Sequence, residues 1–135
     1  MKIVVDKLVS GFLTSLPKRQ QEVLEGRYGL KNGREMTLAA LGNRYGVTRE
    51  RIRQIQNLSL NEIRSKAKEN GLASFAGLVA DHLASVGGLR RDDMLVSDMA
   101  RLADDRGDKN TFGNRVRFLL EASHIVEYHP ADKGY

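Results

Sequence analysis

Residues 48–56 read TRERIRQIQ, and this stretch decides the fold of the first half of the chain. A helix that begins here has two chemically different sides, because successive residues are rotated by about 100°. The apolar side carries Ile52, Ile55, Ser59 and Ile63. The opposite side is polar and carries Arg49, Glu50, Arg53, Gln54 and Asn57. The apolar side can pack against a neighbouring helix, which leaves the polar side facing outward.

The polar side holds the residue types that read base edges in the major groove of DNA. Arginine recognises guanine, glutamine recognises adenine, and glutamate accepts a hydrogen bond from the amino group of cytosine. A basic surface helix without a specific partner is the simplest alternative.

The residues before this helix predict a helix-turn-helix. Thr37 is placed to cap a short helix over residues 38–45, and Gly46 can take the left-handed conformation that closes it. Thr48 then caps the second helix, which we expect to continue to about Glu69. A short helix, a turn containing glycine and a helix with polar residues in its first turns make up the helix-turn-helix layout.

Positive charge is concentrated in the same half of the chain. Residues 1–70 hold 14 Lys and Arg against 7 Asp and Glu, a net charge of +7. Residues 71–135 hold 8 Lys and Arg against 10 Asp and Glu, a net charge of −2, so the whole chain carries +5. A basic excess around the polar helix is what phosphate binding requires.

Composition argues against several other classes of protein. The chain has no cysteine, which excludes disulfides and thiolate metal sites and fits a cytoplasmic protein. No apolar run is long enough to span a membrane, and the first residues are charged too early for a signal peptide. His82, His124 and His129 lack a metal-ligand spacing, and residues 104–108 lack the frame of a calcium loop. We therefore expect no enzyme activity, metal, cofactor or small-molecule substrate.

The spacing of apolar residues predicts a mainly α protein with two domains, residues 1–70 and 71–135. In the first, helices are expected over residues 3–13, 17–28, 38–45 and 48–69. In the second, helices are expected from Ser74 to Gly87-Gly88 and over residues 92–103 and 111–122, with an acidic turn at 104–108 and a strand at 125–129. Three helices and a strand suggest a small winged-helix-like domain. Its partner strand would lie beyond Tyr135, so we expect this domain to be incomplete.

Three segments of the first domain follow one another in a familiar order. They are LPKRQQEVL at residues 16–24, RYGL at residues 27–30 and the run from Thr37 to Gln56. Together, residues 12–68 resemble region 4 of primary bacterial sigma factors, and VTRERIRQI at 47–55 nearly repeats the wording of that family. The resemblance implies a sigma factor-like role in transcription initiation or regulation. Region 4 binds the minus-35 promoter element of double-stranded DNA and docks on the flap of the core RNA polymerase.

The resemblance also assigns roles to individual residues by motif position. It implies that the base-reading residues are Arg49, Glu50 and Gln54. It implies that the residues holding the DNA backbone are Arg44, Thr48, Arg51 and Arg53. Arginine for guanine, glutamate for cytosine and glutamine for adenine describe a mixed site with at least one G·C pair.

The chain departs from the family pattern at several places. Ala39 and Ala40 stand where the family commonly has carboxylates, so the Thr37 cap lacks a reciprocal partner. Residues 57–62 read NLSLNE, where the family tends to continue with Lys and Arg. Within this segment we expect Leu58 to contact another part of the protein, with an exposed partner patch as the alternative. Nothing resembles regions 2 and 3, so the chain is expected to be a sigma-factor fragment or an accessory protein that cannot open a promoter unaided.

The second domain resembles the winged-helix-like domains of the HARE type, which also occur in an auxiliary subunit of bacterial RNA polymerase. This resemblance rests on the order of the helices and on the phrase Gly87-Gly88-Leu89-Arg90. An alternative function stays open for the whole chain. The region 4-like frame could be an interaction module for core RNA polymerase or an anti-sigma partner, with incidental DNA binding.

Overall fold

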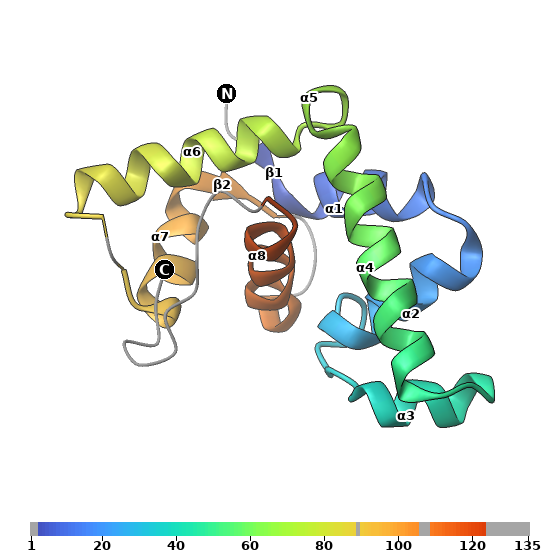
Figure 1. Ribbon diagram of the computed structural model, residues 1–135. Helices are drawn as coiled ribbons and strands as arrows, with labels where there is room; N and C mark the ends of the chain where they lie inside the picture. Colours follow the sequence, from blue (N-terminus) through green and yellow to red (C-terminus); the bar gives the residue numbers. More distant parts are fainter. Residues whose placement is uncertain (1–2, 89, 106–108, 124–135) are drawn as a thin grey trace.

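The computed structural model describes residues 3–88, 90–105 and 109–123 (Figure 1). In chain order the elements are β1 (Ile3–Val4), α1 (Val5–Thr14), α2 (Lys18–Tyr28), α3 (Leu38–Tyr45), α4 (Arg49–Ser65), α5 (Ala67–Asn70), α6 (Leu72–Ser85), α7 (Asp92–Leu102), β2 (Ala103–Asp104) and α8 (Lys109–Ser123). The mainly α fold class is therefore confirmed. Within the described residues, no helix is long and apolar enough to cross a membrane.

The helix ends around residues 37–48 form as their residue types predict. The Thr37 side chain accepts a hydrogen bond from the Ala40 amide, and the Thr48 side chain accepts one from the Arg51 amide, both at 3.0 Å. Gly46 ends α3 in the left-handed region with φ of 68°. Each threonine satisfies an amide that the first turn of its helix leaves without a partner. The helix-turn-helix is thus set by local chemistry.

The second helix of this motif is shorter than expected. α4 ends at Ser65, and Lys66 leaves the helical region with φ of −113° and ψ of 22°. The Asn70 side chain donates to the carbonyl of Ile63 at 3.1 Å, an acceptor that a continuous helix would offer to the amide of residue 67. The expected continuous helix over 48–69 is therefore wrong. The chain breaks at Lys66 and turns into α5.

Two short strands were also not expected from the sequence. β1 pairs with β2 in parallel, with Ile3 opposite Ala103 and Val4 opposite Asp104. The expected helix over 3–13 therefore starts only at Val5, and Asp104 belongs to a strand instead of the acidic turn. The expected strand at residues 125–129 lies outside the described residues.

A cluster of buried side chains spans both halves of the chain. It joins Leu24 of α2 and Ile63 of α4 to Phe75 of α6 and Leu119 of α8. The central element is α8, which contacts α1, α2, α4, α6 and α7 (Figure 1). The division into domains 1–70 and 71–135 remains a prediction. The larger core, however, draws side chains from both sides of residue 70.

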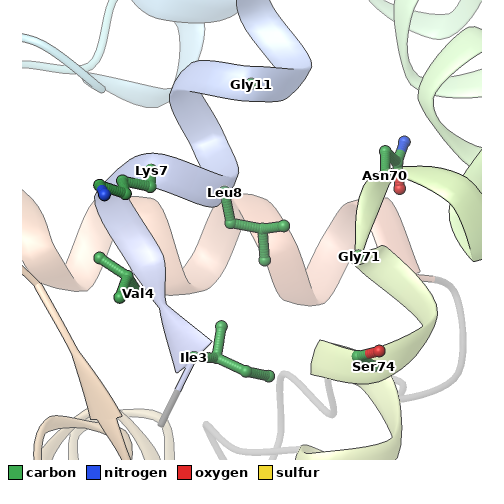
Figure 2. Close-up of a pocket in the computed structure, with 8 residues that line it drawn as sticks. All are labelled: Ile3, Val4, Lys7, Leu8, Gly11, Asn70, Gly71 and Ser74. Carbon is green, nitrogen blue, oxygen red and sulfur yellow. The ribbon is translucent and has the colours of Figure 1, made fainter. Parts of the chain in front are cut away.

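An apolar hollow of about 390 Å³ lies where the start of α1 faces the junction of α5 and α6. Figure 2 shows Leu8 of α1 pointing across the hollow toward Gly71. A Cβ on Gly71 would stand 2.9 Å from a methyl carbon of Leu8, so glycine permits this close approach. The hollow lies near the C-terminal end of α4, away from α3 and the turn of the helix-turn-helix.

Candidate nucleic-acid interface

Gly42 allows the two helices of the helix-turn-helix to meet. A Cβ added at Gly42 would stand 2.6 Å from the carbonyl oxygen of Val47 and 3.3 Å from the Arg49 amide nitrogen. The amide of Val47 donates to the Gly42 carbonyl at 2.9 Å, which closes the turn onto the same residue. Only glycine fits this contact without moving α3 or the start of α4.

A small separate core fixes the rotation of α4 about its axis. Its buried side chains are Val23, Leu41, Ile52 and Ile55. Ser59 is also fully buried and donates to the carbonyl of Ile55 at 2.7 Å. The side of α4 that the sequence predicts to be apolar therefore faces inward as expected. The opposite side faces solvent.

The three predicted base-reading residues lie together on that exposed side. Arg49, Glu50 and Gln54 occupy the first two turns of α4 and are all exposed. Two of them have partners on the same helix. Arg53 donates to Glu50 through Nε at 3.0 Å and also through Nη2, and Arg51 donates to the Gln54 side-chain oxygen at 3.3 Å.

The ion pair between Glu50 and Arg53 favours the charged forms of both side chains. The hydrogen bonds from Arg53 hold the pKa of Glu50 below its usual value, and the same contact raises the pKa of Arg53. Both groups are therefore charged at neutral pH. An ionised Glu50 is an acceptor only, which suits the amino group of cytosine and disfavours an approaching phosphate.

The predicted backbone-binding residues surround this group. Arg51 and Arg53 are exposed on α4, and Arg44 is exposed in the last turn of α3. Thr48 is exposed at the N-terminus of α4, where its oxygen accepts the capping hydrogen bond from Arg51. Its hydroxyl hydrogen can still be donated, for example to a phosphate oxygen. The structure thus brings all seven predicted residues to one end of the helix-turn-helix.

A hollow of about 410 Å³ lies between the N-termini of α3 and α4, and the sequence did not indicate it. It is lined by Arg27, Thr37, Leu38, Ala39, Arg49, Glu50 and Arg53. Arg27 comes from α2 and donates to the carbonyl of Met36 at 3.1 Å, directly before the capping Thr37. Three of these side chains are cationic and one, Glu50, is anionic, so a net positive charge beside two helix N-termini outweighs the effect of Glu50 and can attract a phosphate. Sequence reasoning missed Arg27 because the loop over 29–36, which brings the start of α3 next to α2, has no periodic pattern that would predict this contact.

Leu58 does not make the contact that was expected of it. Its side chain is 55% exposed on the outer side of α4, so the expectation of an internal contact is wrong. Residue 58 faces away from the neighbouring helices because buried Ser59 and Leu60 take up the inward positions on this turn. No group of three or more His, Asp and Glu that could hold a metal ion occurs among the described residues.

The same part of the chain matches a known protein family. The model of sigma-70 region 4 matches residues 12–65. The chain is 41% identical over 61 residues to the RNA polymerase principal sigma factor HrdD of Streptomyces viridifaciens. These residues are 45% of this chain and 18% of that protein. It is 45% identical over 56 residues to the sigma factor SigA4 of Synechococcus elongatus, and these residues are 42% of this chain and 18% of that protein.

A third relative is the sigma factor SigA of a Bacillus species, 43% identical over 63 residues, which are 47% of this chain and 17% of that protein. The chain thus spans less than a fifth of the length of these curated relatives. The matched residues 12–65 contain α2, α3 and α4, including the whole exposed polar side of α4. Residues 12–65 of this chain are therefore similar to region 4 of the sigma-70 family.

Proposed function

We propose that the chain binds double-stranded promoter DNA at a minus-35-like element, as a sigma factor-like protein of transcription initiation. In this proposal the first turns of α4 enter the major groove. Arg49, Glu50 and Gln54 contact base edges, and the backbone-binding residues are Arg44, Thr48, Arg51 and Arg53. Core RNA polymerase, through its flap, is the proposed protein partner. A cytoplasmic location follows from these two partners.

One observation carries the proposal. The predicted base-reading residues Arg49, Glu50 and Gln54 are all exposed on one side of α4, while its opposite side is buried in the small core. Region 4 is a DNA-binding module and not an enzyme. A duplex can therefore approach the polar side of α4 without any rearrangement of the helices.

Fluorescence anisotropy with two labelled duplexes tests the proposal. One duplex contains a minus-35 sequence and the other a scrambled sequence of the same composition, both at about 0.15 M salt. We expect the minus-35 duplex to bind about tenfold or more tightly, because a single well-made base contact already discriminates by about that factor. Equal affinities for the two duplexes would contradict sequence-specific binding.

A second candidate function is an interaction module for core RNA polymerase or an anti-sigma partner. It is favoured by the exposed Leu58, which lies in the segment over residues 57–62, where the chain has no Lys or Arg. Capture of purified core polymerase by the chain, together with equal binding of both duplexes, would support this candidate over the first. Leu58→Ser should then weaken the capture.

A further inference from the structure

We infer that the loop over residues 29–36, between α2 and α3, is a further contact to a DNA backbone phosphate. We also infer that Asn114, in the second half of the chain, is the residue that positions this loop. The inference rests on the proposed function, because it assumes that the helix-turn-helix binds DNA. Neither the loop residue Arg34 nor Asn114 belongs to the base-reading or backbone-binding sets described above.

Asn114 reaches the loop from α8, outside the residues that match region 4. It is 9% exposed, and its side-chain amide donates to the carbonyl oxygens of Gly29 at 3.2 Å and of Gly33 at 3.1 Å. One side chain therefore holds both ends of a five-residue turn. Without it, two carbonyl groups in a partly buried place would lose a hydrogen-bond donor.

The backbone of the loop is folded closely around this contact. Gly29 has φ of 63°, and a Cβ there would stand 2.9 Å from both the Arg34 carbonyl carbon and the Asn114 side-chain nitrogen. The amide of Gly33 donates to the Gly29 carbonyl at 3.2 Å, and the amide of Arg34 donates to the Asn32 side chain at 2.9 Å. The position of Arg34 is thus set by the turn that Asn114 ties together.

The loop leads directly into the predicted interface. Met36 donates through its amide to the carbonyl of Gly26 at 2.8 Å and accepts a hydrogen bond from Arg27. The next residue, Thr37, caps α3 and lines the 410 Å³ hollow together with Arg49 and Arg53. Arg34 therefore lies three residues before the cap of α3, past which the duplex backbone would run in the proposed function.

Arg34 is the side chain in the loop that is suited to contact a phosphate. It is exposed, and within the described part of the chain its guanidinium makes no ion pair. Lys31 is also exposed but pairs with Glu25 at 3.1 Å. Glu35 carries the one opposing charge, so the loop has a net charge of +1. The partner that fits is a single phosphate of the duplex, since the major groove is already occupied by α4 in the proposed function.

The first part of the test measures how the affinity for the minus-35 duplex depends on salt. Each phosphate contact contributes about −0.9 to the slope of log K against log salt. Arg34→Ala should reduce the slope by about this amount on both the minus-35 and the scrambled duplex, whereas Arg34→Lys should retain it. The matched control is Lys68→Ala, because exposed Lys68 lies in α5 beyond the far end of α4. Its slope should equal that of the wild type.

The second part tests the positioning role through a double-mutant cycle. Asn114→Ala should reduce the slope by the same amount as Arg34→Ala, and the double variant should have the slope of either single variant. Circular dichroism establishes that each variant is folded. Should Asn114→Ala not fold, Asn114→Leu takes its place, because it keeps the approximate size of the side chain and removes both donated hydrogens without adding a charge.

The outcomes separate this inference from the proposed function. An unchanged slope for Arg34→Ala, in a chain that still prefers the minus-35 duplex, would overturn the phosphate contact and leave the proposed function standing. Additive slope changes in the double variant would overturn the positioning role of Asn114. Equal binding of both duplexes by the wild type would instead contradict the proposed function itself.

Discussion

Arg49 is the exposed residue at the N-terminal end of α4, and it has the side chain that can bind guanine by two hydrogen bonds. Arg49→Ala should cost about 1–3 kcal/mol of binding free energy on the minus-35 duplex and relax the preference for guanine at one position. The measurement is anisotropy with a set of duplexes that differ at single base pairs. Lys68→Ala, which removes the same charge elsewhere, is the control. Equal losses on cognate and scrambled duplexes would refute a base-reading role.

Arg53 should behave differently because, in the proposed function, it holds a backbone phosphate, and such a contact carries no sequence information. Arg53→Ala should weaken binding to minus-35 and scrambled duplexes alike and reduce the salt slope by about 0.9. It should also let the pKa of Glu50 return toward its usual value, since Arg53 is the main cause of the lowering. Salt titrations and carbon-13 NMR of the Glu50 carboxylate measure the two effects. A loss confined to the minus-35 duplex would make Arg53 a base-reading residue instead.

For single residues, the sequence predicts those contacts that depend on neighbours along the chain. The caps at Thr37 and Thr48 and the inward isoleucines of α4 follow from local spacing, and the structure confirms them. The hydrogen bonds of Asn114 to Gly29 and Gly33 could not be predicted, because they join residues more than 80 positions apart. Leu58 was assigned wrongly, since hydrophobicity alone does not decide which side of a helix faces solvent.

Among the elements, the crossing of α3 and α4 depends on Gly42. Gly42→Ala would place a Cβ 2.6 Å from the Val47 carbonyl oxygen, which must push the two helices apart. We expect a loss of about 1–3 kcal/mol in unfolding free energy and weaker DNA binding, because the start of α4 moves relative to α3. Chemical denaturation and anisotropy measure the two losses.

The matched control for this prediction is Gly77→Ala in α6. A Cβ at Gly77 would meet nothing within 4 Å, so the substitution should leave DNA binding unchanged and raise stability by up to about 1 kcal/mol through helix propensity. Equal stability of Gly42→Ala and the wild type would show that the turn can relax and does not require glycine.

Asp98 of α7 is held by three side chains of the second half of the chain, two arginines and a histidine. Its side chain is 2% exposed and accepts hydrogen bonds from Arg90 at 2.8 Å, Arg101 at 2.9 Å and His82 at 2.7 Å. Hydrogen bonds from Arg90, then from His82, hold the pKa of this carboxyl far below its usual range. The folded state therefore binds fewer protons here than the unfolded state, in which the pKa is about 3.9.

It follows that Asp98 stabilises the fold above about pH 4 and that this contribution is lost as the pH falls below that value. Asp98→Asn should lower the unfolding free energy at pH 7 by about 1–3 kcal/mol, the usual effect of losing hydrogen bonds to charged groups. It should also reduce the decline in stability between pH 5 and pH 3. Denaturant unfolding across this range measures both effects. Parallel curves for the variant and the wild type would contradict the assignment.

Element boundaries show where the sequence pattern stops being informative. At the break between α4 and α5, the Asn70 side chain donates to the Ile63 carbonyl, and helix propensity gives no sign of this contact. The pairing of β1 with β2 joins two-residue segments about 100 positions apart, so no alternating pattern can develop. The helix-turn-helix was predictable because its elements are consecutive and its turn is short.

The whole molecule is held together by contacts between its two halves. The Arg64 guanidinium of α4 donates to the carbonyls of Glu121 and Ala122 at 2.9 Å, which supplies donors to the last turn of α8. The rings of Tyr28 and Phe118 meet with centroids 5.1 Å apart. These contacts and the larger core predict that region 4 and α8 unfold together, although region 4 alone matches a known family.

Thermal unfolding should therefore show a single transition in which the calorimetric and van't Hoff enthalpies agree. Leu119→Ala, at a fully buried position of α8, should cost about 2–5 kcal/mol. Hydrogen exchange should report the same loss at the Ile52 amide in the small core, although Ile52 belongs to a different cluster from Leu119. Protection that falls in α8 but is unchanged at Ile52 would show that domains 1–70 and 71–135 fold independently. In that case the second half would not be needed to hold α4 in place.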